Sequence, residues 1–250
     1  MTYPGGKHGS GVYQQIINRI PPHELYIEAF LGGGAILKMK RPAAASIGID
    51  LDPQVIDNFP RSGTPNLTLL EQNAIDWLSL QKFTSTTFLY LDPPYLLSSR
   101  RKNARIYAYE LYGQDHIDLL RIIKTLPCMV MISGYPNELY DDALSSWTTA
   151  TFWGQTRGRA PATEKVWMNY PPPIRLHDYR YLGNTFRERE MIKRKRLRWL
   201  KRFMAMEDLE RNALGAAIDD LNSLAFMRPL HFIDDGQHHQ EERTQPMKTF

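Results

Sequence analysis

The chain has 250 residues, of which 42% are hydrophobic and 23% charged, with one cysteine and a formal net charge of +4. This length suffices for one complete α/β core with an appendage. The single cysteine, Cys128, excludes an internal disulfide and a cysteine-based zinc site, and no apolar run approaches the roughly 18 residues of a membrane-spanning helix. The first residues lack a basic-then-apolar leader pattern, so we expect a cytoplasmic protein with no membrane partner.

From Tyr26 to Tyr170 short β-like runs alternate with helical stretches, the pattern of a mostly parallel sheet covered by helices. We expect a Rossmann-like α/β fold with seven strands, of which the last two pair as an antiparallel hairpin. The predicted strands cover residues 25–29, 46–50, 67–71, 87–91, 128–133, 148–153 and 164–169. The predicted helices cover residues 35–40, 53–58, 75–81, 114–124 and 137–144.

After Thr185 the character of the sequence changes. Residues 186–225 contain no proline and one glycine, and apolar residues recur at three- and four-residue spacing, which indicates an amphipathic helix. Residues 187–202 hold nine Lys/Arg and two Asp/Glu, a local +7, which leaves the rest of the chain at −3. We therefore expect an α/β domain over residues 1–183, a basic helical extension over 184–230 and a polar, disordered tail over 231–250.

Asp92-Pro93-Pro94-Tyr95 directly follows the predicted strand 87–91. Each proline lacks an N–H and fixes φ, and a residue before proline is kept out of the helical region, so the carbonyls of Asp92 and Pro93 are held rigidly. A carboxylate, a fixed carbonyl and a flat ring suit a planar heterocycle that carries an amino group. The alternative is a structural Pro-Pro turn with Tyr95 as its cap.

Three earlier strand ends carry residues suited to a nucleotide-like ligand. The turn Gly32–Gly34 lets a ligand approach the backbone closely. Asp50 ends the next strand, where an acidic residue typically accepts hydrogen bonds from ribose hydroxyls. Asp50 could instead cap the following helix, but Asp52, which directly precedes a proline, is the better candidate for that cap. Asn73 follows the third strand as an adenine contact or a helix cap. Ribose, adenine and amine contacts together predict methyl transfer from S-adenosylmethionine to a nucleobase amine.

With these motifs the chain resembles the DNA adenine methylase family, the Dam-like amino-methyltransferases of phages and restriction systems. Tyr3–Lys7 matches the family's aromatic-x-Gly-Gly-Lys motif, and Glu28–Gly34 matches its strand-Phe-x-Gly-x-Gly motif. Asp50 stands at the ribose position, and Asp92–Tyr95 matches the catalytic motif. Two departures from the family are Asn73, where many members carry Asp, and the interval from Gly34 to Asp92. That interval is too short for the target-recognition domain of the longer members.

The resemblance implies S-adenosylmethionine as the cofactor and the 6-amino group of an adenine, flipped out of double-stranded DNA, as the methyl acceptor. It implies a catalytic role for Asp92, Pro93, Pro94 and Tyr95, the last by stacking on the base. It implies cofactor contacts from Tyr3, Lys7, Phe30, Gly32, Gly34, Asp50, Asn73, Ala74 and Asp92. DNA contacts are expected after Tyr95, from Arg100, Arg101, Lys102, Arg105, Arg157, Arg159, Lys193, Arg194 and Arg196.

Several alternatives stay open. Pro127-Cys128 matches the nucleophile dipeptide of cytosine carbon-5 methylation, although Cys128 opens an apolar run and is expected to be buried. A cytosine amino group, RNA or a protein glutamine amide would suit the same acceptor pair. A non-enzymatic DNA-binding module would explain the basic extension but not the other motifs. The apolar face of this extension also suits packing against a second subunit in a homodimer. The histidines lack ligand spacing, so no metal site is expected.

Overall fold

The structure is a computed structural model that describes residue 7 and residues 11–100, 105–155 and 161–225. The chain divides into two compact units, Met1–Arg194 and Lys195–Phe250, with the boundary inside helix α7 (Phe186–Met204). No helix in the described part of the chain is both long and apolar enough to cross a membrane. The polar tail over 231–250 and some expected site residues lie outside the described residues: Tyr3, Arg101, Lys102, Arg157 and Arg159.

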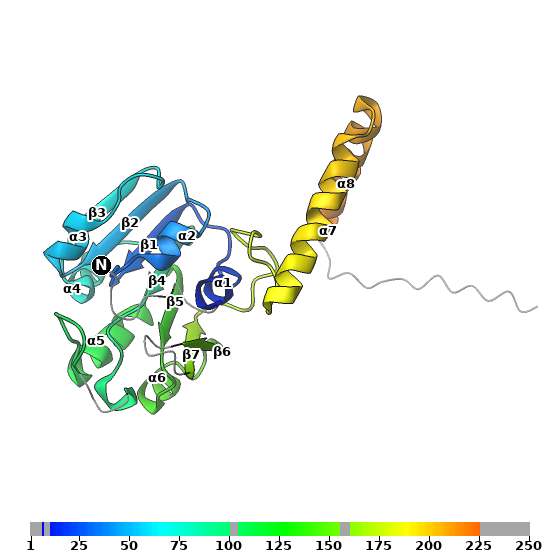
Figure 1. The fold of residues 1–250 in the computed structure, drawn as a ribbon. Coiled ribbons are helices and arrows are strands. Elements are labelled where there is room, and N and C mark those ends of the chain that lie inside the picture. The colour runs from blue at the N-terminus through cyan, green and yellow to red at the C-terminus, as the bar shows by residue number, and fades with distance from the viewer. Residues whose placement is uncertain (1–6, 8–10, 101–104, 156–160, 226–250) are drawn as a thin grey trace, which may run out of the picture. The chain divides into compact units, whose positions relative to one another are not determined.

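Seven strands form one sheet in the order β3-β2-β1-β4-β5-β7-β6 (Figure 1). All neighbouring pairs are parallel except those of β7, which runs antiparallel to both β5 and β6. The expected α/β architecture is confirmed: every predicted strand is present, three with the predicted ends and four with ends shifted by one to three residues. The strands are β1 (Leu25–Ala29), β2 (Ala45–Asp50), β3 (Leu67–Glu71), β4 (Thr87–Leu91), β5 (Met129–Gly134), β6 (Thr148–Gln155) and β7 (Pro161–Met168).

The helices follow the strands much as predicted, with two differences. Helix α1 (Val12–Ile17) was not predicted because it is short and begins at Gly11, which offers no side-chain cap. The single predicted extension is two helices, α7 and α8 (Asp208–Ala225). The other elements are α2 (Ala35–Met39), α3 (Pro53–Asn58), α4 (Ala74–Leu80), a 3-10 turn η1 (Leu97–Ser99), α5 (Gly113–Ile123) and α6 (Glu138–Ala143).

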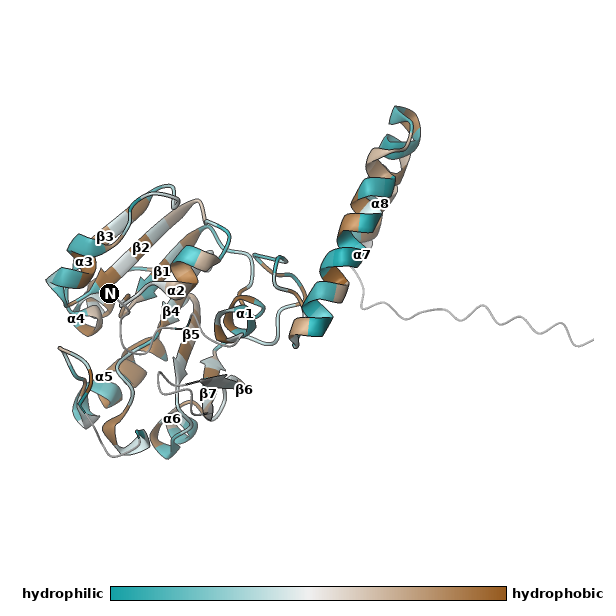
Figure 2. Cartoon of the chain, viewed as in Figure 1, coloured by the Kyte–Doolittle hydropathy of each residue, from teal (hydrophilic) through white to brown (hydrophobic). Residues whose placement is uncertain are grey.

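Strand β4 is buried along its whole length because both faces of the sheet are covered. Successive side chains of a strand point to opposite faces. Phe88 and Tyr90 join an apolar cluster that includes residues of α1, α2 and α3, whereas Leu89 and Leu91 join one that includes residues of α4, α5 and α6. The apolar strands at the centre of the sheet stand out in Figure 2.

The strand order reverses direction between β1 and β4. From β1 the chain continues to β2 and β3 on one side, and β4 and β5 then extend the sheet on the other. In such open α/β sheets the crevice beyond the carboxyl ends of the strands at this switch point is where ligands bind. The turns after β1 and β4, which carry Gly32 and Asp92, therefore meet at this crevice.

Gly34 has a left-handed backbone with φ of 56°, and a Cβ at this position would overlap the ring of Phe59. We expect Gly34→Ala to lower the unfolding free energy by about 1–2 kcal/mol for the backbone plus about 1–3 kcal/mol for the overlap. Gly63→Ala is the matched control, because Gly63 has φ of 89° but no atom within 4 Å of an added Cβ. Urea unfolding measures both costs, and equal losses in the two variants would contradict the packing role of Gly34.

Candidate active site

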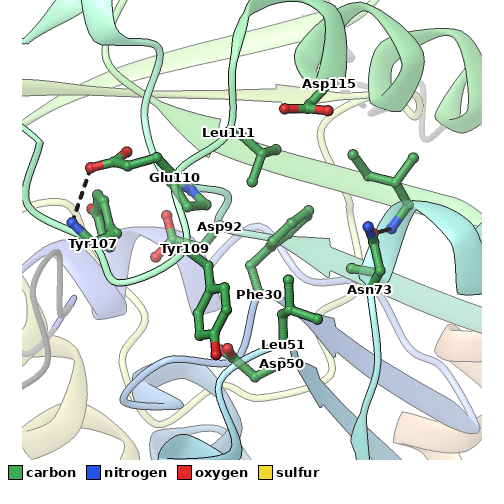
Figure 3. A pocket seen from close by; sticks show the side chains of 13 residues that line it. Phe30, Asp50, Leu51, Asn73, Asp92, Tyr107, Tyr109, Glu110, Leu111 and Asp115 are labelled. Atoms are coloured by element: carbon green, nitrogen blue, oxygen red, sulfur yellow. Dashed lines mark hydrogen bonds between the residues drawn. The ribbon is translucent and has the colours of Figure 1, made fainter.

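A pocket lies beyond the carboxyl ends of β1, β2, β3 and β4 (Figure 3). Four successive turns supply one wall, and the segment before α5 together with the first turn of α5 supplies the other. The wall from the turns consists of Phe30, Asp50, Leu51, Asn73, Ala74, Ile75, Asp92 and Pro94. The opposite wall consists of Tyr107, Tyr109, Glu110, Leu111 and Asp115. The pocket thus brings together six of the residues predicted from the sequence, namely Phe30, Asp50, Asn73, Ala74, Asp92 and Pro94.

Asp50 is fixed by backbone donors on both of its carboxylate oxygens. The N–H of Gly32 donates to Oδ2 at 2.7 Å, and the N–H of Asp52 donates to Oδ1 at 2.9 Å. Burial raises the pKa of this carboxyl above its ordinary value, against the opposing effect of these donors. Each oxygen keeps lone-pair capacity for a further donor. Asp50 is therefore a rigid acceptor at the pocket wall.

The turn after β1 combines strain with packing. Phe30 has φ of 62°, a left-handed conformation that costs roughly 1–2 kcal/mol for a residue other than glycine, and its ring lines the pocket (Figure 3). Gly32, also left-handed, acts on the pocket through its N–H to Asp50. Gly34 was expected to contact a cofactor, but it does not line the pocket, and the space beside it is filled by Phe59 and Leu31.

Two of the polar residues after the strands are helix caps. The Asp52 side chain accepts from the N–H of Gln54 at 2.9 Å and caps α3, as predicted. Asn73 caps α4, because its Oδ1 accepts from the N–H of Ile75 at 2.9 Å. Asn73 also lines the pocket (Figure 3), so the cap and a ligand contact through its Nδ2 are compatible.

Asp92 presents its two oxygens differently. Oδ1 accepts from Lys7 Nζ at 2.7 Å and from Ser133 Oγ at 3.0 Å, and Ser133 Oγ in turn lies 2.9 Å from the hydroxyl of Tyr90. Oδ2 accepts no hydrogen bond from the part of the chain that the structure describes. The carboxylate is therefore held through one oxygen at the edge of the pocket, and the other is available to a donor on a ligand (Figure 3).

Lys7 is buried between two carboxylates. Its Nζ lies 3.3 Å from Glu164 Oε1, it also hydrogen-bonds to the hydroxyl of Tyr95, and that hydroxyl donates to Glu164 Oε1 at 2.6 Å. Burial lowers the pKa of Lys7, but the charges of Asp92 and Glu164 outweigh burial and hold it above the ordinary value. Burial raises the pKa of Glu164, and Lys7 opposes this rise. Lys7 is thus an ammonium that fixes Asp92.

Glu164 is the residue of this cluster that sequence reasoning missed. Its one signal was a carboxylate within the last predicted strand, which is an unusual choice for a buried position. Its partner, Lys7, is far away in the sequence and could not be named from it.

Tyr95 does not occupy the position expected of it. It was predicted to stack on a substrate ring, but it is buried, does not line the pocket and meets Tyr135 edge-on at 4.5 Å between ring centroids. Tyr107 and Tyr109 supply the tyrosine rings of the pocket instead. Burial, with a contribution from Asp92, raises the pKa of Tyr107 to about 12. Pro93 is likewise buried outside the pocket lining.

The far wall is held by a buried ion pair. Arg100 Nη1 and Nη2 donate to the two carboxylate oxygens of Glu110 at 2.9 and 2.6 Å. Glu110 Oε1 also accepts from the N–H groups of Ile106 at 2.7 Å and Tyr107 at 3.0 Å. Arg100 was expected to contact DNA, but its side chain is only 5% exposed, so its role here is to shape the wall of the pocket.

The other expected DNA contacts in the described residues lie at the surface. Arg105 is exposed, with its guanidinium 5.8 Å from the ring centroid of Tyr112. The cations of α7 that were predicted are also exposed, namely Lys193, Arg194 and Arg196. Cys128 is buried, and burial raises the pKa of its thiol to about 11. A thiol of this kind is a poor nucleophile, which disfavours cytosine carbon-5 chemistry.

No protein-family model matches the chain, and no curated protein does. The chain is similar to a precorrin 8w decarboxylase from Methanobacterium thermoautotrophicum, with a TM-score of 0.43 and 16% identity over 66% of this chain and 91% of that one. It is similar to a dimethyladenosine transferase from Plasmodium falciparum, with a TM-score of 0.41 and 14% identity over 62% of this chain and 60% of that one. It is also similar to the 23S rRNA methyltransferase ErmE, with a TM-score of 0.43 and 10% identity over 67% of this chain and 71% of that one. Similarity of this extent does not specify an activity.

The buried cluster predicts non-additive costs of substitution. We expect Lys7→Met to lower the unfolding free energy by about 3 kcal/mol, because it leaves the buried Glu164 carboxylate without its cation. Glu164→Gln should lower it by about 1–2 kcal/mol, because Lys7 keeps Asp92 as a partner. The double variant should lose at least about 1 kcal/mol less unfolding free energy than the sum of the losses in the two single variants. Denaturant unfolding measures all three.

The control for this cycle is Asp118→Asn, which breaks the exposed pair with Arg121 and should cost less than about 1 kcal/mol. Strictly additive losses for Glu164→Gln and Lys7→Met would show that the two side chains do not act as one cluster.

Proposed function

We propose that the protein is an S-adenosylmethionine-dependent methyltransferase that methylates the exocyclic 6-amino group of adenine in double-stranded DNA. One observation carries this proposal. Asp92 is held through Oδ1 by Lys7 and Ser133, and its Oδ2 remains available at a pocket that also contains the rigid acceptor Asp50. Asp92 Oδ2 can accept a hydrogen bond from an amine, and Asp50 can accept hydrogen bonds from a ribose. This combination favours transfer of a methyl group from a nucleoside cofactor to an amine.

The residues of the pocket fit the proposed cofactor. Asp50 carries two fixed oxygens with remaining capacity, which suit the two hydroxyls of a ribose. Phe30 and Tyr109 supply rings that an adenine can contact, and Asn73 offers an amide. When bound, S-adenosylmethionine supplies an electrophilic methyl group, and the carbon–sulfur bond breaks with its electron pair on sulfur.

The part played by the chain is to orient the amine. The exocyclic nitrogen of adenine is a poor nucleophile because its lone pair is delocalised into the ring. Asp92 lines the pocket, and its Oδ2 would accept one N–H bond of the amine and direct the lone pair to the methyl carbon. Pro93 lies outside the pocket lining, so its carbonyl is given no part in this step. After the new nitrogen–carbon bond forms, one N–H proton leaves through Asp92. Positioning and electrostatics account for the rate.

The choice of DNA rests on three supports. They are the resemblance of the motifs to the DNA adenine methylases, the cations at Arg105 and along α7, and the need to flip a base out of a duplex before reacting with it. Tyr107, rather than Tyr95, is the tyrosine ring that would contact such a base, because it lines the pocket and Tyr109 is assigned to the cofactor.

We expect Asp92→Asn to reduce methylation by at least about 100-fold, because the amide cannot accept with both oxygens and carries no charge. Cofactor affinity should change by less than about threefold, because Asp50 and the turn after β1 remain. The measurement is mass spectrometry of nucleosides from unmethylated DNA incubated with isotopically labelled S-adenosylmethionine, with calorimetry for the cofactor.

The control for this assay is Asp118→Asn, which is expected to keep full activity. Labelled 6-methyladenine from the wild type supports the proposal, whereas label in methylcytosine would overturn the choice of base. Absence of label in DNA, with label in RNA or in protein amides, would overturn the choice of polymer.

The contribution of α7 to DNA binding is tested by salt dependence. Each phosphate contact contributes about 0.9 to the slope of log affinity against log salt concentration, so Arg194→Gln combined with Arg198→Gln should reduce the slope by about 1.8. Arg121→Gln, an exposed cation on α5, is the control and should leave the slope unchanged. An unchanged slope in the double variant would remove α7 from the DNA interface.

A further inference from the structure

Helices α7 and α8 carry apolar side chains that remain exposed. No residue of α7 is buried, and three residues at helical spacing, Leu197, Leu200 and Met204, are 51%, 51% and 68% exposed. On α8 the matching row of Leu214, Ile218 and Leu221 is 40%, 52% and 64% exposed. Figure 2 shows apolar segments alternating with polar ones along both helices. Rows at three- and four-residue spacing are the pattern with which helices pack against one another.

The two helices carry opposite charge. Helix α7 contains nine Lys/Arg and two Asp/Glu, a net +7, and α8 contains four Asp/Glu and one Arg, a net −3. At 3.6 residues per turn, Arg196 and Lys201 flank the apolar row of α7. By the same geometry Glu210 continues the row of α8, Arg211 lies on the other side of the row, and Asp220 lies on the far face of the helix. The two helices therefore complement each other in net charge, and Glu210 is the carboxylate that adjoins the row.

We propose that a second copy of this chain covers these rows, with α7 of each copy packed on α8 of the other in a four-helix bundle. Pairing α7 with α7 would bring two helices of +7 together, whereas α7 on α8 pairs a helix of +7 with one of −3 and places Glu210 beside a basic helix. A twofold arrangement makes this contact twice with the same surfaces. DNA is a poorer occupant of these rows, because phosphates neither cover apolar side chains nor attract the acidic α8.

The full-length protein tests the contact by light scattering coupled to size exclusion. The wild type should have a mass of about 58 kDa, twice the 29.0 kDa of one chain, and Leu200→Glu combined with Ile218→Glu should have 29.0 kDa. The matched control is Leu80→Glu on α4, where the side chain is 80% exposed, and this variant should remain a dimer. A wild type that is monomeric, or that dimerises only with DNA, would overturn the proposal.

Charge reversal identifies which helices meet. One variant carries Arg196→Glu and Lys201→Glu on α7, and another carries Glu210→Lys on α8. Each alone places like charges across the contact and should be a monomer, whereas a mixture of the two should form a 58 kDa heterodimer. Circular dichroism confirms that the helices persist in each variant. If either variant dimerises alone, or if the mixture stays monomeric, α7 does not pack on α8 of a second copy.

Discussion

The ammonium group of Lys7 is the interaction on which the candidate site depends. It binds Oδ1 of Asp92 and lies against Glu164, so three charges share one buried position. Removing water from two carboxylates is costly unless a cation lies between them. Because Lys7 occupies Oδ1, the orientation of Asp92 is settled before any ligand arrives. What remains for a ligand is the second oxygen, Oδ2, at the edge of the pocket.

The sheet topology supplies the other half of the site. The strand order reverses between β1 and β4, so the turn that fixes Asp50 through Gly32 opens on the same crevice as Asp92. Neither turn gains its shape from a ligand. The first depends on the left-handed Phe30, Gly32 and Gly34, and the second on two prolines. A pocket preorganised in this way would hold the cofactor and the amine of the proposed reaction in a fixed relation, which is the main requirement of a displacement that uses positioning.

The sequence predicted the strands and their end residues well, because short apolar runs and strand-terminal polar residues are local signals. It missed what depends on partners distant along the chain. Glu164 pairs with a lysine from the other end of the domain. Arg100 looked like a surface cation, yet its geometry is set by Glu110. Tyr95 has a role that follows from Lys7 and Glu164 rather than from its motif, since their charges engage its hydroxyl.

Under the proposed DNA function, α7 would compensate for the lack of an inserted recognition domain between Gly34 and Asp92. Arg198 projects away from the row of Leu197, Leu200 and Met204, since it lies at least 100° around the helix from each of them, and Arg194 lies at one side of the row. One helix can therefore contact phosphates with one face and a second chain with the other. A dimer formed through the apolar row would carry two such basic faces, which increases the number of phosphates contacted without any added domain.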